Sequence, residues 1–185
     1  MRITGGDARG LPLKVPSNAN VRPTTDMVRG AIFSMLASMT GEWSPRVCDL
    51  FAGSGALGIE ALSRGAEWVD FVDQNPRCCG IIKQNLTTTG FHENAHVYCS
   101  GVNKAISFLD GRYDLIFLDP PYADKTIFDI ITQISMSNFI KNGTVMVIPH
   151  TIRLMVEDSY NGLQLVKQKK HGDTCISIFC QEAGV

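Results

Sequence analysis

The chain has 185 residues, with 17 Lys and Arg against 18 Asp and Glu, and a formal net charge of −1. This length suits one buried core and is short for two domains, and the charge gives no global reason to expect a polyanionic partner. No apolar run approaches membrane-spanning length, and the first residues lack the apolar core of a signal peptide. We therefore expect a cytoplasmic protein with no membrane partner.

The N-terminal residues 1–20 are rich in Gly, Pro, Asn and Arg, and the alternation of Leu11, Leu13 and Val15 predicts an irregular β-hairpin. A helix follows, with Thr24 or Thr25 as its cap, and it ends at Gly41. This end of the chain is basic through Arg2, Arg9, Lys14, Arg22 and Arg29. Composition alone favours a solvated extension that covers the core over an arm that contacts phosphates.

The central stretch is 46–64, RVCDLFAGSGALGIEALSR. Apolar residues predict a buried strand over 47–51, the glycines predict a tight turn, and the apolar spacing after them predicts a helix. A strand, a glycine turn and a helix N-terminus together form a nucleotide pocket, because glycine lets the backbone lie against a ligand and the first helical N–H groups are unpaired.

The spacing Gly53-x-Gly55-x-x-Gly58 fits the dinucleotide fingerprint. Asp73 ends a predicted strand over 68–73, about 20 residues further on, where a carboxylate binds an adenosine ribose. Taken alone, this pattern would suggest a nicotinamide dehydrogenase. However, the carboxylate of Asp49 would repel a pyrophosphate, and it could bind the ammonium of S-adenosylmethionine, which carries no phosphate.

The rest of the chain alternates between helices and strands. We expect helices over 76–90, around 106–109 and over 127–140, and strands over 95–100, 113–118 and 144–148. Strands over 163–170 and 174–180 form a terminal hairpin. The pattern predicts one α/β domain over 1–185, with a core over 46–185, a mainly parallel sheet and an antiparallel strand inserted at one edge.

Cysteines and lysines carry less information. The six cysteines form no C-x-x-C pair, which favours reduced structural thiols, and we expect no metal. Lys167, Lys169, Lys170 and His171 could face RNA, although a charged, exposed hairpin is the favoured interpretation.

The second chemical motif is Asp119-Pro120-Pro121-Tyr122, which follows an apolar strand. The amine of a nucleobase is a poor nucleophile because its lone pair is delocalised into the ring. A carboxylate (Asp119) and a carbonyl (Pro120) that accept its N–H bonds can favour tetrahedral geometry at the nitrogen. Pro121 stiffens this backbone, and Tyr122 can stack on a base that has left its helix. The motif therefore predicts methyl transfer to an exocyclic amine.

The sequence resembles the RsmD family of bacterial methyltransferases that act on guanine N2 in small-subunit (16S) ribosomal RNA. The resemblance rests on Arg22-Pro23-Thr24-x-Asp26-x-Val28-Arg29, on Phe51 to Ala66 and on Asp119 to Tyr122. It implies a Rossmann-like, class I S-adenosylmethionine-dependent fold with an N-terminal extension over 1–40 that engages RNA.

The resemblance also implies residue roles. The residues expected to bind the cofactor are Asp49, Phe51, Gly53, Ser54, Gly55, Asp73, Gln74 and Asn103. Asn103 stands where the family often has an acid. The residues expected to contact RNA are Arg2, Arg9, Lys14, Arg22, Thr24 and Arg29. The target guanine would be held by Asp119, Pro120, Pro121 and Tyr122.

The expected partner is small-subunit ribosomal RNA, within an assembled or assembling 30S particle, and the expected state is a monomer. A DNA adenine-N6 or cytosine-N4 methyltransferase remains an alternative, since such enzymes share the Asp-Pro-Pro-Tyr tetrad. A non-catalytic RNA-binding assembly factor is a second alternative, although simple binding has no need of an amine clamp.

Overall fold

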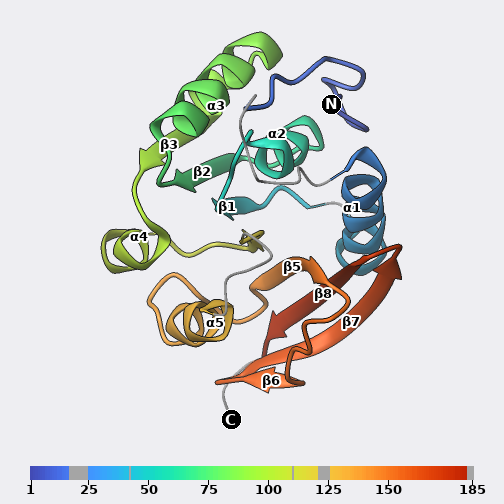
Figure 1. Ribbon diagram of the computed structural model, residues 1–185, viewed down its shortest axis with the longest axis vertical. Helices are drawn as coiled ribbons and strands as arrows, with labels where there is room; N and C mark the ends of the chain where they lie inside the picture. Colours follow the sequence, from blue (N-terminus) through green and yellow to red (C-terminus); the bar gives the residue numbers. More distant parts are fainter. Residues whose placement is uncertain (17–24, 42, 110, 121–125, 183–185) are drawn as a thin grey trace.

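A computed structural model describes residues 1–16, 25–41, 43–109, 111–120 and 126–182, and Figure 1 shows its helices and strands. In this part of the chain a single eight-stranded sheet has helices on both faces. The helices are α1 (Asp26–Thr40), α2 (Ala56–Ser63), α3 (Pro76–Thr89), η1 (His92–Asn94), α4 (Val102–Phe108) and α5 (Ile127–Ser135). The strands are β1 (Arg46–Leu50), β2 (Trp68–Asp73), β3 (Ala95–Cys99), β4 (Leu115–Leu118), β5 (Val145–Thr151), β6 (Ser159–Tyr160), β7 (Leu163–His171) and β8 (Thr174–Gln181).

The strands lie in the order β3-β2-β1-β4-β5-β8-β7-β6. The first five are parallel, as crossover helices require, whereas β8 is antiparallel to both β5 and β7. This confirms the predicted Rossmann-like fold, with a mainly parallel sheet and a C-terminal antiparallel hairpin. β1 lies between β2 and β4, and the strand order runs outward in opposite directions on its two sides. Ligands of open α/β sheets bind at such a reversal of strand order.

Two apolar layers hold the sheet. On one face lie α1, α2, α3 and the N-terminal residues, with Phe33 of α1 packing edge to face on Phe117 of β4 at 5.8 Å between ring centroids. On the other face lie α4 and α5. Since both faces of the sheet are covered here, β4 is apolar throughout and β1 is apolar except at Arg46 and Asp49, as is typical of parallel sheets.

Predicted helix ends are confirmed where a cap defines them. The Thr25 hydroxyl accepts a hydrogen bond from the N–H of Val28 at the start of α1, and the Asn75 side chain does the same for Arg77 at the start of α3. The predicted helix over 127–140 is too long, because α5 ends at Ser135. The Ser137 hydroxyl donates to the carbonyl of Ile134 in the last turn and competes with a further turn.

The N-terminal residues form the expected irregular hairpin, with one bridge between Arg2 and Pro12. It is fastened to the end of α2, where the Ser63 carbonyl accepts from the Asp7 N–H at 2.7 Å. Gly6 has a φ of 76°, and a Cβ there would lie 1.6 Å from the Ser63 carbonyl oxygen, so only glycine fits. Along the described part of the chain, no helix has the length and apolar character needed to cross a membrane.

Candidate active site

The carboxyl edge of the parallel strands brings the predicted residues of three strands together. Leu50, the last residue of β1, is in register with Val72 of β2 and Leu118 of β4. The residues that follow are therefore neighbours, and the N–H of Asp119 donates to the Leu50 carbonyl at 3.3 Å. Phe51, Asp73 and Asp119 consequently meet at the point where the strand order reverses.

The glycine turn is built from backbone that bends in the left-handed region. Gly53 and Gly55 have φ values of 59° and 76°, and Phe51, which has a side chain, has a φ of 59°. A left-handed residue other than glycine stores strain, and such residues cluster at ligand sites. Gly58 has a different role: a Cβ there would lie 2.3 Å from the Phe71 ring, so its absence lets α2 pack closely on β2.

Asp73 holds this turn in place. One carboxylate oxygen accepts from the Gly53 N–H and the other accepts from the Asn75 N–H, each at 2.8 Å. The side chain is half-buried at the end of β2. The loop that starts α4 lies beside it, since the Ser100 N–H donates to the Asp73 carbonyl. Gln74 is exposed in the loop after β2, and Asn103 is exposed in the first turn of α4.

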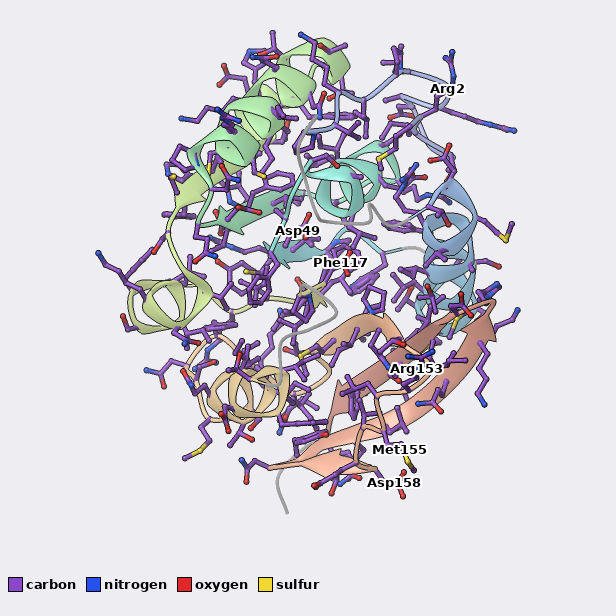
Figure 2. The ribbon with its side chains drawn as sticks, in the orientation of Figure 1. Arg2, Asp49, Phe117, Arg153, Met155 and Asp158 are labelled. Carbon is purple, nitrogen blue, oxygen red and sulfur yellow. The ribbon has the colours of Figure 1, made fainter. Side chains whose placement is uncertain are left out.

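Asp49 lies beneath the turn, between α2 and the sheet, and Figure 2 labels it there. Its side chain is buried, and it accepts a hydrogen bond from the Gly58 N–H at 2.9 Å. Burial raises the pKa of Asp49 well above its ordinary value, the Gly58 hydrogen bond lowers it, and the nearby charges of Asp119 and Asp73 raise it further. The position where a helix N-terminus would receive a phosphate is thus taken by a carboxylate of the protein itself.

Ser54 is buried within the turn rather than open to a ligand. Its hydroxyl contacts the sulfur of Met1 at 3.8 Å, and its carbonyl accepts from the Asn85 side chain at 2.9 Å. Asn85 also bonds both backbone groups of Lys14. The N-terminal hairpin, the turn and α3 are therefore tied together.

Of the predicted amine clamp, Asp119 and Pro120 lie within the described residues. Asp119 is half-buried at the carboxyl edge beside Phe51, and Pro120 is buried. Pro121 and Tyr122 lie outside the described residues. Proximity to Asp49 and Asp73 makes this a site where three carboxylates gather, and such a site favours a cation.

The basic residues of the N-terminal region divide into two groups. Arg2, Arg9 and Lys14 are exposed, while Arg22 and Thr24 lie outside the described residues. Arg29 is fully buried, so its predicted contact with RNA is wrong. Its guanidinium pairs with Glu60 at 3.2 Å and with Asp26 at 3.0 Å, and it also donates to the Arg2 carbonyl.

Glu60 is the residue that sequence reasoning missed. Besides Arg29, it accepts from the backbone and hydroxyl of Thr4 at 2.8 and 2.6 Å and from Arg64 at 2.9 Å. Burial alone would raise its pKa, but the hydrogen bonds from Thr4, Arg64 and Arg29 together lower it. A signal was present: Arg29 falls on the apolar stripe of α1, three and four residues before Ile32 and Phe33.

Among the described residues, no group of three or more His, Cys, Asp or Glu side chains could hold a metal ion.

Comparisons with known proteins give one consistent result. A family model described as "Conserved hypothetical protein 95" matches residues 1–180. The Escherichia coli (strain K12) protein "Ribosomal RNA small subunit methyltransferase D" is 30% identical over 186 residues, covering 99% of this chain and 91% of that protein. YlbH of Bacillus subtilis (strain 168) is 33% identical over 182 residues, covering 97% and 98%. The solved structure of Escherichia coli yhhF superposes with a TM-score of 0.85 at 28% identity, covering 100% and 99%.

Proposed function

The chain belongs to the family described as Conserved hypothetical protein 95, the RsmD family, and from that premise we propose that it methylates the exocyclic N2 amine of a guanine in small-subunit (16S) ribosomal RNA. It is an S-adenosylmethionine-dependent rRNA methyltransferase. The observation that carries the finer proposal is the meeting of Asp119 with the glycine turn and Asp73 at one edge of the sheet.

The residues at this edge fit S-adenosylmethionine better than a dinucleotide. The buried carboxylate of Asp49 accepts from the Gly58 N–H, so it occupies and charges the place that a pyrophosphate would need. Among the described residues, only the Phe51 carbonyl oxygen lies within 4 Å of where a Cβ of Gly53 would be, which leaves room for a ligand. In the proposal, Asp49, Phe51, Gly53, Ser54 and Gly55 surround the methionine end, Ser54 through its backbone.

The adenosine end of the cofactor belongs beside β2 and β3 in this proposal. Asp73 binds the ribose, with Gln74 in the loop after β2 and Asn103 in the first turn of α4 beside it. When bound, the cofactor supplies a methyl group that its sulfonium has already activated. The protein must therefore bind, orient and desolvate the reacting amine.

Asp119 and Pro120 carry that task. The Asp119 carboxylate and the Pro120 carbonyl accept the two N–H bonds of the guanine amine, which aims its lone pair at the methyl group. As the nitrogen–carbon bond forms, the methyl–sulfur bond would break with its electron pair left on sulfur; the nitrogen loses one proton, and the Asp119 carboxylate is the acceptor next to it. Pro121 and Tyr122 complete the clamp in the proposal, with Tyr122 stacking on the base.

The RNA surface in this proposal includes Arg2, Arg9 and Lys14, which are exposed on the N-terminal hairpin. Arg22 and Thr24, between that hairpin and α1, are proposed to join them. We further propose that the protein acts as a monomer on an assembled or assembling 30S particle, since it presents no separate RNA-binding domain in the described residues.

The test is methyl transfer from labelled S-adenosylmethionine to small ribosomal subunits, and to protein-free 16S rRNA, that lack the modification. The RNA is digested and the product nucleoside is identified by mass spectrometry. Wild-type protein should give N2-methylguanosine. Asp119→Ala should lower the rate by about 100-fold or more, because it removes the oriented acceptor, while cofactor affinity stays within about fivefold. Asp129→Ala, an exposed acid of α5, is the matched control and should keep full activity.

A labelled adenine or cytosine in duplex DNA, with none in rRNA, would instead favour the DNA methyltransferase. Cofactor binding without transfer to any of these substrates would favour the assembly factor. Equal rates on protein-free 16S rRNA and on subunits would contradict the preference for a ribonucleoprotein substrate.

A further inference from the structure

The second half of β7 carries three lysines within four residues, at Lys167, Lys169 and Lys170. The acidic residue nearest to them in sequence is Asp173, in the turn to β8. Lys169 and Lys170 are exposed and Lys167 is half-buried. In a chain with a net charge of −1, this is a local concentration of positive charge, so the direction in which each lysine points becomes important.

A β-bulge sets that direction. Leu165 pairs with Phe179 of β8, but Lys167 pairs with the very next residue, Ile178, so Val166 is an extra residue in β7. Leu165 and Phe179 face the layer of α4 and α5. Without the bulge Lys167 would face the same way, since side chains alternate along a strand. With it, Lys167 and Lys169 pair with Ile178 and Ile176, which face α1 and α2.

Two side-chain contacts agree with this register. The ammonium of Lys167 donates to the hydroxyl of Ser38 on α1 at 2.9 Å. Gln168, the next residue, donates to the hydroxyl of Ser177, which also bonds His150 on the α4 and α5 side. Lys170 comes two residues after Gln168, so it lies on the same face as Gln168, and it pairs with Cys175. Adjacent lysines of one strand therefore lie on opposite faces of the sheet.

Lys167 and Lys169 lie on the same face of the sheet as Asp119 at the candidate active site. Lys167, Ile178, Val147 and Phe117 lie in one row across β7, β8, β5 and β4. Three steps between strands place Lys167 about 14 Å from Phe117. Asp119 comes two residues after Phe117 and therefore points to the same face, and Lys169 likewise comes two residues after Lys167.

The N-terminal hairpin lies at the other end of α1 on this face. Arg29, in the first turn of α1, donates to the Arg2 carbonyl, and Ser38, in the last turn, meets Lys167. Nine helical residues separate these two contacts, a rise of about 13.5 Å. Figure 2 shows Arg2 above α1 and Arg153 below it. Arg153 is exposed, and the N–H of the residue before it donates to the carbonyl of Asp173 in the hairpin turn.

We propose that Lys167 and Lys169 bind phosphates of the substrate RNA on the side of the active site opposite to the N-terminal hairpin, so that the RNA crosses the face of α1 between two basic surfaces. The proposal rests on the proposed function. Lysines on one face of an exposed strand give non-specific phosphate contacts, which position a polyanion and leave base recognition to other groups.

The experiment compares Lys167→Gln/Lys169→Gln, which removes two charges, with Lys170→Gln, a control that removes one charge from the neighbouring position on the other face. RNA affinity is measured for 16S rRNA over 50–300 mM salt, together with cofactor affinity and thermal unfolding. The double variant should bind RNA about 10-fold more weakly at 0.15 M salt, with a log–log salt slope reduced by about 1.5 to 2. Lys170→Gln should change affinity less than about twofold.

Ser38→Ala removes the hydrogen bond between Lys167 and α1 but keeps the lysine charge. If the charge is what binds RNA, this variant should leave RNA affinity unchanged. Equal weakening by Lys170→Gln and by the double variant would overturn the proposal, because the face would then not matter. Unchanged affinity in the double variant would overturn it as well. Either result, obtained with wild-type protein that still methylates rRNA, would leave the proposed function standing.

Discussion

Two parts of the same face of the sheet carry opposite charge. At β1, β2 and β4 the carboxylates of Asp49, Asp73 and Asp119 gather around the glycine turn. Three strands away, the bulge in β7 turns Lys167 and Lys169 toward α1. The acidic part is buried or half-buried, and backbone N–H donors fix the carboxylates of Asp49 and Asp73. The basic part is more exposed, and its side chains end in or near solvent.

This difference shows how one face of a sheet can bind a cationic cofactor and a polyanionic RNA at separate places. A cofactor with an ammonium and a sulfonium gains from fixed, partly buried carboxylates, where a low dielectric strengthens attraction. A long polyanion gains from exposed lysines that release counterions. In the proposed arrangement, placing the two charges on separate strands would keep the RNA phosphates away from the carboxylates while the target base reaches Asp119.

The largest expected effect concerns Arg29 of α1, a basic residue that belongs to neither charged part because it is buried against Glu60. Arg29→Met should lower the free energy of unfolding by about 3–5 kcal/mol, because it leaves the buried carboxylate of Glu60 without its closest buried cation. Urea unfolding measures this. Arg9→Met, an exposed control, should change it by less than about 0.5 kcal/mol. A small loss of stability with a large loss of RNA affinity would return Arg29 to the RNA surface.

Salt sharpens the comparison further. Raising salt from 50 to 200 mM should weaken RNA binding roughly 20- to 500-fold, given three to five lysine and arginine contacts to phosphate. Cofactor affinity should change less than about twofold, since its partners are buried and screened little. Titration calorimetry and filter binding on the same protein give both numbers. If the two affinities depended on salt to the same degree, the two parts would not be separate.

The smallest expected effect comes from Asp49→Asn. The amide can still accept from the Gly58 N–H, so the turn should survive, but the lost charge should weaken cofactor binding about 10-fold. Because burial raises the pKa of Asp49 in the folded state, this carboxyl lowers stability progressively as pH rises above the ordinary aspartate pKa, and the cost is complete above the raised pKa. The variant should therefore melt higher than wild type at neutral pH. The gain should shrink as pH falls and vanish below the ordinary aspartate pKa of about 3.9, where both folded and unfolded carboxyls are protonated. Melting curves from pH 4 to 8 test this, and a variant less stable than wild type at neutral pH would contradict it.

Much of the fold was accessible from sequence because its signals are local. The glycine turn, the caps at Thr25 and Asn75, and the carboxylates after apolar strands depend on neighbours in the chain. The fate of Arg29 was not accessible from charge counting, because its partner Glu60 lies 31 residues away. The two-residue β6 is too short to show a period.

The bulge at Val166 also escaped sequence reasoning. Alternation predicted a strand over 163–170, and the strand is present. Which face each lysine takes depends on one extra residue relative to β8, and that is a property of the pairing rather than of β7 alone. The choice between an RNA-facing strip and a solvated hairpin therefore needed the register.

The position of β8 has a consequence for how the protein is made. β8 (Thr174–Gln181) comes last among the described strands, yet it lies inside the sheet, paired with all seven residues of β5. During synthesis, β5 must wait with an apolar, unpaired edge until that final segment has left the ribosome. An open edge of this kind invites pairing with other chains. The sheet is therefore completed only after β8 has been synthesised, and a nascent chain stalled before residue 174 presents an aggregation-prone strand.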